Sequence, residues 1–164
     1  MSFINQTDSK LEMLQGVQVL VVDNDRDSSY LYTVLLNNLG ATVTTADSIK
    51  EALEALRRFV PNILICEMRF LGESINTLTT QLSASEVGGD HIPVIAITAW
   101  LTDSLAQILE ADFEDYLLKP IDPDQLVALV REFASGRRSS PSHDRVRLKM
   151  KLEHRYKKLA AVSL

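Results

Sequence analysis

Four short apolar runs of the sequence each end in side chains that carry charge or form hydrogen bonds. Short apolar runs rich in Val and Ile are typical of strands buried in a parallel sheet. Such a sheet binds its ligand at the carboxyl ends of the strands, near the point where the strand order switches. Acidic, hydroxyl and amine groups are therefore expected to converge on one site. In chain order they are Asp23 with Asn24, Glu67, Thr98, and Lys119 with Pro120.

Strand and helix signals alternate along the chain in the order of a parallel, doubly wound α/β sheet. Every predicted strand is short and is followed by a helical pattern, and the last strand leads into the final helix of the domain. The strands are expected at about 17–23, 41–45, 62–67, 93–98 and 116–118.

The helices between these strands are indicated by capping residues and apolar stripes. Asp27 or Ser28 is expected to cap the first helix. Ser48, with Glu51 three residues later, predicts a capping box at the start of the second helix, and Asp122 followed by a proline predicts the start of the last. The apolar face of the first helix is expected to consist of Leu31, Val34, Leu35, Leu36 and Leu39.

The ordered set of polar residues resembles the receiver domain of two-component response regulators, over about three quarters of the chain. In that family a histidine kinase transfers phosphate to an aspartate at this sheet edge. The resemblance implies a flavodoxin-like fold with five parallel strands in the order 2-1-3-4-5 and a C-terminal helical extension. It aligns Asp23 and Asn24 with the acidic pair, Glu67 with the phosphoryl acceptor, Thr98 with the hydroxyl that follows the phosphate, Tyr116 with the switch aromatic, and Lys119 and Pro120 with the lysine and its cis-proline.

Glu67 is the main departure from the family pattern. Its additional methylene moves the carboxylate by about a bond length, and a misplacement of ~1 Å can cost 10²-fold in rate. A glutamate here resembles a fixed stand-in for phosphoaspartate, although phosphorylation adds about −1.5 to −2 charge and one carboxylate imitates only part of that. The alternative is a structural ion pair between Glu67 and Lys119, with no switch retained.

The magnesium site that the resemblance implies is also altered. Mg²⁺ requires close to six oxygen ligands at about 2.0–2.1 Å. Asn24 supplies a neutral oxygen where the family has a carboxylate, and Asp25 is a displaced substitute. Arg69 stands at the position whose carbonyl binds the metal and adds a positive charge. We expect weak or absent Mg²⁺ binding and no other cofactor.

Trp100 and Tyr116 are candidate interface residues. Trp100 follows Thr98 in the loop that intact receivers rearrange on activation, and Trp is over-represented in interface hot spots. Tyr116 is expected on the same side of the domain. The alternative is that Trp100 folds back over the altered acidic pocket.

Charge is distributed unevenly along the 164 residues, which have a net charge of −5. Residues 137–164 carry nine Lys or Arg and two acids, a net +7, whereas the remainder carries −12. We expect an N-terminal extension over 1–15, a receiver-like domain over 16–135 and a basic extension over 136–164. Alternating apolar residues in this extension would suit a strand, but its strong helix formers favour a helix. Arg147, Lys151 and Arg155 are its candidate contacts to a partner.

The predicted function is a phosphorylation-independent signalling module that acts by protein–protein interaction and is not an enzyme. Its expected partner is a kinase or an output protein. A homodimer could form through the basic extension, here called the tail, or through the face of the helix that follows the fourth strand. One alternative is a working phosphoreceiver with an atypical Mg²⁺ site. A second is an adaptor that binds nucleic acid through the basic tail, although the tail has no helix-turn-helix pattern. The lack of a long apolar segment and the single cysteine predict a cytoplasmic protein with no membrane span.

Overall fold

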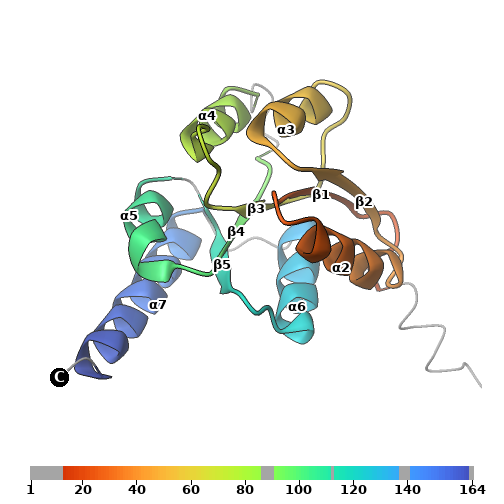
Figure 1. Ribbon diagram of the computed structural model, residues 1–164. Coiled ribbons are helices and arrows are strands. Elements are labelled where there is room, and N and C mark those ends of the chain that lie inside the picture. Colours follow the sequence, from red (N-terminus) through yellow and green to blue (C-terminus); the bar gives the residue numbers. More distant parts are fainter. Residues whose placement is uncertain (1–12, 86–90, 112, 137–140, 163–164) are drawn as a thin grey trace, which may run out of the picture.

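The computed structural model describes residues 13–85, 91–111, 113–136 and 141–162. Within them the chain forms one parallel sheet with the strand order β2-β1-β3-β4-β5, which confirms the predicted order (Figure 1). All strands run parallel, and the order in which they are added to the sheet switches at β1, which pairs with both β2 and β3. The strands are β1 (Gln18–Val22), β2 (Thr42–Ala46), β3 (Ile63–Glu67), β4 (Val94–Thr98) and β5 (Asp115–Leu118).

Helices cover both faces of the sheet and enclose two apolar layers. α2 (Arg26–Asn37) and α6 (Pro123–Ala134) pack on one face, together with the strand residues that point toward them. α3 (Ile49–Leu56), α4 (Ile75–Ser85) and α5 (Leu101–Glu110) contribute to the layer on the other face. β3 and β4 are buried along their whole length, as their continuous apolar runs predict. The doubly wound α/β fold expected from the sequence is therefore confirmed.

The first helix differs from the sequence prediction in its start and in its buried face. Asp25, rather than Asp27 or Ser28, is the N-cap residue, and its side chain accepts a hydrogen bond from the backbone N–H of Asp27. Leu36 is buried as expected, but Leu31 is 56% exposed. The face of α2 that packs on the sheet consists of Ser29, Tyr32 and Leu36, which are spaced three and four residues apart.

The predicted caps of two other helices are confirmed. The Ser48 hydroxyl accepts the backbone N–H of Glu51, and the Glu51 carboxylate accepts the backbone N–H of Asp47. Asp122 caps α6, with Pro123 in its first turn. Glu73, in the loop after β3, also accepts hydrogen bonds from two backbone N–H groups at the start of α3. A carboxylate is favourable there because the helix N-terminus is partially positive.

The C-terminal extension is helical, as the helix formers in its sequence predict. α7 (Pro141–Val162) packs against α5 and extends beyond the body of the domain at its C-terminal end (Figure 1). Leu148 and Leu152, one turn apart, are buried in the core cluster that α5 also lines. Tyr156, on the same helical face, is 52% exposed because it lies farther along the helix. No helix among the described residues is long and apolar enough to span a membrane.

Candidate functional site

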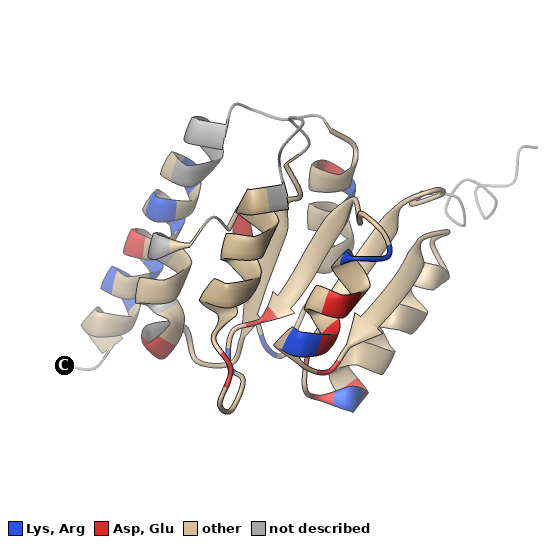
Figure 2. Ribbon diagram, turned by 90° about the horizontal axis from the view of Figure 1, so that it is seen from above, with Lys and Arg blue, Asp and Glu red and all other residues tan. Residues whose placement is uncertain are grey.

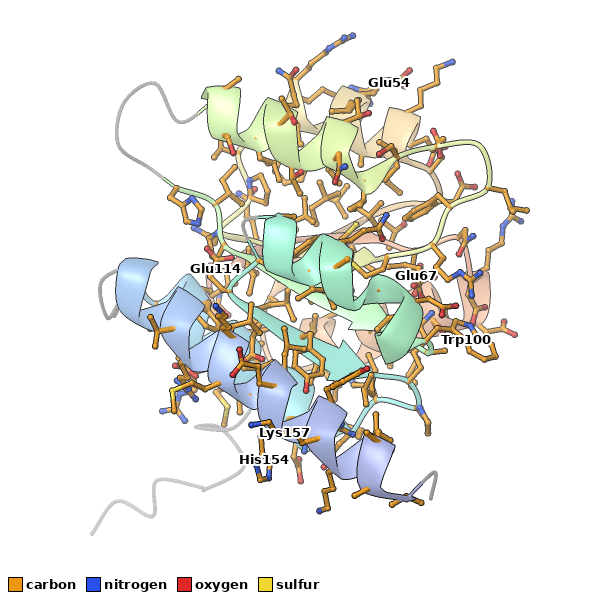
Figure 3. All side chains as sticks on the ribbon, turned by 90° about the vertical axis from the view of Figure 1, so that its left-hand side faces the viewer. Glu54, Glu67, Trp100, Glu114, His154 and Lys157 are labelled. Carbon is orange, nitrogen blue, oxygen red and sulfur yellow. The ribbon has the colours of Figure 1, made fainter. Side chains whose placement is uncertain are left out.

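The polar residues that end β1, β3, β4 and β5 meet at one edge of the sheet, as predicted. Glu67 and Trp100 lie at this edge in Figure 3, whereas Glu114 lies at the opposite one. Asp23, Glu67 and Thr98 are all buried. The parallel arrangement accounts for this convergence, because every strand delivers its last side chain to the same edge.

Lys119 joins two of these acids. Its Nζ atom lies 2.9 Å from Asp23 Oδ2 and 2.8 Å from Glu67 Oε2. Burial alone would lower the pKa of Lys119, but the hydrogen bonds to Glu67 and Asp23 outweigh it and raise that pKa above its usual value. The amine therefore remains protonated and holds the two carboxylates together. The peptide bond between Lys119 and Pro120 is cis, as the resemblance implies.

Glu67 also forms hydrogen bonds with the backbone that follows it. Its Oε1 atom accepts the N–H groups of Met68 at 2.7 Å and Arg69 at 3.2 Å. One carboxylate oxygen thus binds the loop and the other binds Lys119. The longer side chain of glutamate allows this arrangement, and neither oxygen points freely into the cleft.

The side chains of Asn24 and Asp25 make their hydrogen bonds to residues other than Asp23. The Asn24 side-chain amide lies 3.4 Å from the carbonyl oxygen of Arg69 and is oriented to donate to it. Asp25 caps α2, and the Ser28 hydroxyl donates to its carboxylate, which is the main reason that the Asp25 pKa is lowered. Asp23 in turn accepts the backbone N–H of Asp25. The three residues are therefore held mainly by contacts within the protein.

Thr98 forms its hydrogen bonds away from Glu67. Its hydroxyl lies 3.1 Å from the Ser104 hydroxyl and accepts the backbone N–H of Trp100 at 3.0 Å. Ser104 is buried on α5. Ser104 was not predicted as a site residue, although it is a serine near the start of the helix that follows Thr98.

Trp100 lies at the rim of the cleft beside Arg69. The Arg69 guanidinium carbon is 5.8 Å from the centre of the Trp100 ring, and the Arg69 Nη1 atom is 3.7 Å from Asp103 Oδ2. Trp100 remains 58% exposed. Glu67, Lys119, Arg69 and Trp100 line a cleft of about 670 Å³. Trp100 therefore borders the altered pocket, as one prediction expected, and is also accessible, as an interface residue must be.

Tyr116 and the basic residues of α7 form a second contact region on β5. Tyr116 is buried, and the Lys151 Nζ atom lies 4.7 Å from the centre of its ring. Lys151 also binds Asp115 at 2.5 Å, and Arg147 binds Glu132 on α6 at 3.1 Å. Arg147 and Lys151, which the sequence suggested as partner contacts, therefore bind the chain's own domain. Asp115 was not singled out, although a charged residue at the start of a buried strand is unusual.

The Tyr116 hydroxyl is buried and neither donates nor accepts a hydrogen bond among the described residues. Burial raises the pKa of Tyr116, and the nearby Arg155 guanidinium offsets part of that increase. Arg155 also lines the cleft that borders Tyr116, on the side of α7.

Comparison with known proteins gives matches to the receiver domain that the sequence resembles. The family model of the response regulator receiver domain matches residues 19–131. An uncharacterized 14.6 kDa protein in the sodA1 3′ region of Leptolyngbya boryana is 34% identical over 124 residues, which are 75% of this chain and 94% of that protein. The transcriptional regulatory protein ZraR of Klebsiella oxytoca is 31% identical over 78% of this chain.

The solved structures show the same fold. The solution structure of the apo receiver domain of Nitrogen Regulatory Protein C is 31% identical and has a TM-score of 0.64. The match covers 76% of this chain and 99% of that receiver domain. By contrast, this chain spans only 28% of the length of ZraR. The similarity to ZraR therefore concerns one of its domains and not the whole regulator.

Proposed function

Because the chain belongs to the response regulator receiver family, we propose that it is a two-component signalling module that acts by protein–protein interaction without being phosphorylated. Receivers of two-component systems interact with kinases and output domains, and a protein of one of these classes is the proposed partner. The module is not an enzyme in this proposal, since its surface and not a chemical step carries the signal.

The environment of Glu67 is the observation that carries the proposal. A phosphoryl acceptor needs an oxygen that is free to attack, and a small displacement lowers the rate strongly. Glu67 uses one oxygen for Lys119 and the other for two backbone N–H groups. It therefore fills the position of the acceptor as a bound, negatively charged group.

The contacts of Thr98 favour a fixed structural pair over a full imitation of the phosphorylated state. In the family this hydroxyl follows the phosphate on activation. Here it is engaged by Ser104 and by the backbone N–H of Trp100. Glu67 and Lys119 are thus proposed to hold a single conformation of the site.

Weak Mg²⁺ binding is part of the same proposal. The Arg69 carbonyl, which would supply a ligand, faces the amide nitrogen of Asn24, a hydrogen-bond donor that cannot bind a cation. One oxygen of Asp23 binds Lys119 and the other accepts a backbone N–H. The Arg69 carbonyl, Asn24 and Asp23 therefore do not supply the octahedral set of oxygen ligands that Mg²⁺ requires.

The contacts of α7 argue against the nucleic-acid alternative. Phosphate binding requires Lys and Arg side chains that are free to reach the backbone of the nucleic acid. Lys151 and Arg147 instead bind Asp115 and Glu132 of their own domain.

Labelling with acetyl phosphate tests the proposal. The wild type is compared with the double variant Asn24→Asp plus Glu67→Asp, in the presence and absence of Mg²⁺, and oligomeric state is followed by light scattering. We expect no label on the wild type and Mg²⁺-dependent label on the double variant. The variant Glu67→Gln serves as a control that cannot accept phosphate at this position.

Label on the wild type that is lost in Glu67→Gln would overturn the proposal and establish a working phosphoreceiver. If the unlabelled wild type has the same assembly state as the labelled double variant, Glu67 imitates the phosphorylated form. If it has the assembly state of the unlabelled double variant, Glu67 is a structural residue only.

A further inference from the structure

The second contact region on β5 carries an inference about how the module binds partners. We propose that the surface formed by β5, α5 and α6 is a receptor for a basic amphipathic helix, that α7 occupies it within the same chain, and that a partner helix of the same chemistry binds there by displacing α7. This surface is called the β5 face below and includes Ile108, Asp115, Tyr116 and Glu132. The inference does not depend on whether Glu67 accepts phosphate.

Two leucines anchor α7 on the β5 face. Leu148 is 5% exposed and Leu152 is fully buried. Both belong to the same apolar cluster as Ile108 of α5 and Tyr116 of β5. Their spacing of four residues places them on one side of a helix. The apolar part of the receptor is therefore a site for two residues one helical turn apart.

Opposite charges flank these anchors. Lys151 binds Asp115, whose side chain is only 8% exposed, and its ammonium group also lies over the Tyr116 ring. Arg147, one turn earlier, binds Glu132 on α6. Figure 2 shows Lys and Arg recurring along α7. The charge pattern matches the division of the sequence into an acidic body and a basic tail, and it defines what kind of helix the β5 face accepts.

α7 does not fill the β5 face completely. A cleft of about 650 Å³ remains between the two, with Arg147, Lys151 and Arg155 on the side of α7 and Pro120, Gln125 and Leu129 on the side of the domain. The residues that line this open cleft face solvent on one side, so they make fewer dispersion contacts than they would in a tightly packed interface. Among residues 146–162, whose burial is described, Leu148 and Leu152 are the two that are buried. A partner helix that buries more than these two side chains would therefore bind the β5 face more tightly than α7 does.

α7 is also an addition to the receiver domain and not one of its parts. The family model ends at residue 131, before α7 begins. The matched receiver of Nitrogen Regulatory Protein C is covered over 99% of its length by 76% of this chain. α7 therefore covers a face of the domain without belonging to the family's own fold, which is the arrangement expected of an internal ligand.

Competition between α7 and an added helix tests the inference in the full-length chain. The probe is a fluorescein-labelled peptide of residues 141–164, followed by fluorescence anisotropy. The receptor is either the wild type or the variant Leu148→Ser plus Leu152→Ser, in which α7 remains attached but loses its anchors. We expect the variant to bind the peptide at least about tenfold more tightly, because the resident helix no longer occupies the site.

Two controls test whether the β5 face recognises the leucine anchors and the basic residues of the helix. A peptide that carries Leu152→Ser should not bind, and the affinity of the unmodified peptide should fall as salt is raised, since ion pairs at a partly exposed interface are screened. A second receptor variant, Arg147→Glu plus Lys151→Glu, keeps both leucines in place. It should also bind the peptide more tightly than the wild type does, so that the test does not depend on one variant's folding.

The inference is overturned if the peptide binds neither variant, because the β5 face is then no receptor. It is also overturned if the wild type and both variants bind the peptide equally, because α7 then does not compete for the surface. Neither result bears on acetyl phosphate labelling, so the outcome is separate from that of the proposed function.

Discussion

Two lysines contact carboxylates at opposite ends of the same strand, and they differ in burial and in how they are held. Lys119 follows β5 and binds Asp23 and Glu67, whose side chains are 1% and 8% exposed. Lys151 reaches Asp115 at the start of β5 from a separate helix, and its own side chain is 42% exposed, against 19% for Lys119.

The difference shows that similar ion pairs can have unlike roles. Removal of one partner from a buried pair leaves an uncompensated charge in the interior, whereas an exposed pair contributes little. The first lysine is fixed by strands that share one sheet, so it cannot leave without unfolding of the domain. The second can leave with α7, after which water can solvate both groups.

Substitution of each lysine by methionine should give the largest contrast. Lys119→Met leaves Asp23 and Glu67 buried beside each other without a cation, and we expect the free energy of unfolding at neutral pH to fall by about 3–5 kcal/mol. Lys151→Met should cost about 1 kcal/mol or less, because Lys151 is itself half exposed and water can solvate Asp115 once α7 moves away from it. Urea denaturation followed by circular dichroism measures both values.

The matched control for the first substitution removes the stranded charges as well. In the triple variant Asp23→Asn, Glu67→Gln and Lys119→Met, most of the lost stability should return. An equal loss for the two single lysine variants would contradict the proposed difference between a built-in pair and a releasable one.

The sequence was sufficient to predict the fold and the location of the site. Continuous apolar runs set β1, β3 and β4, and the polar residue after each run had to lie at the same sheet edge as the others. The contact between Glu67 and Lys119 followed from this arrangement. The pattern of the strands therefore contained most of the geometry that matters for the site.

The details that the sequence did not predict depend on choices between equally plausible partners. Asp25, Asp27 and Ser28 can all cap a helix, and only the folded chain shows that Asp25 does so. The charges of α7 suit either an external partner or the acidic β5 face, and composition alone does not distinguish them. The sequence likewise did not show whether the Thr98 hydroxyl would bind Glu67 or Ser104.

Truncation of a leucine anchor sharpens the comparison at the level of local stability. Leu152→Ala would cost about 2–5 kcal/mol if α7 were an integral part of the core. If α7 is releasable, we expect a smaller loss in global unfolding and an almost complete loss of hydrogen-exchange protection in the amides of α7, with β3 and β4 unchanged. Met150→Ala, at a position that is 65% exposed, is the control and should alter neither quantity.

The ionisation of Tyr116 gives the smallest and most local effect. Burial raises the pKa of Tyr116, so the folded protein resists its ionisation. The stability that this provides is complete below the ordinary tyrosine pKa of about 10 and is lost as the pH rises from there through the folded value. Because burial also raises the pKa of Tyr32, the measurement is made in a Tyr32→Phe background.

In that background, release of α7 by Leu148→Ser plus Leu152→Ser should lower the pKa of Tyr116 toward its ordinary value, because the loss of burial outweighs the loss of the Arg155 guanidinium, which has the smaller effect on that pKa. Ultraviolet difference spectroscopy at increasing pH measures the shift, and a further Tyr116→Phe substitution identifies the residue responsible. An unchanged Tyr116 titration would mean that β5 and its helices bury the ring without help from α7. Release of α7 would then leave the β5 face unaltered. Lys151 would be a surface contact that does not stabilise β5, the strand that also positions Lys119.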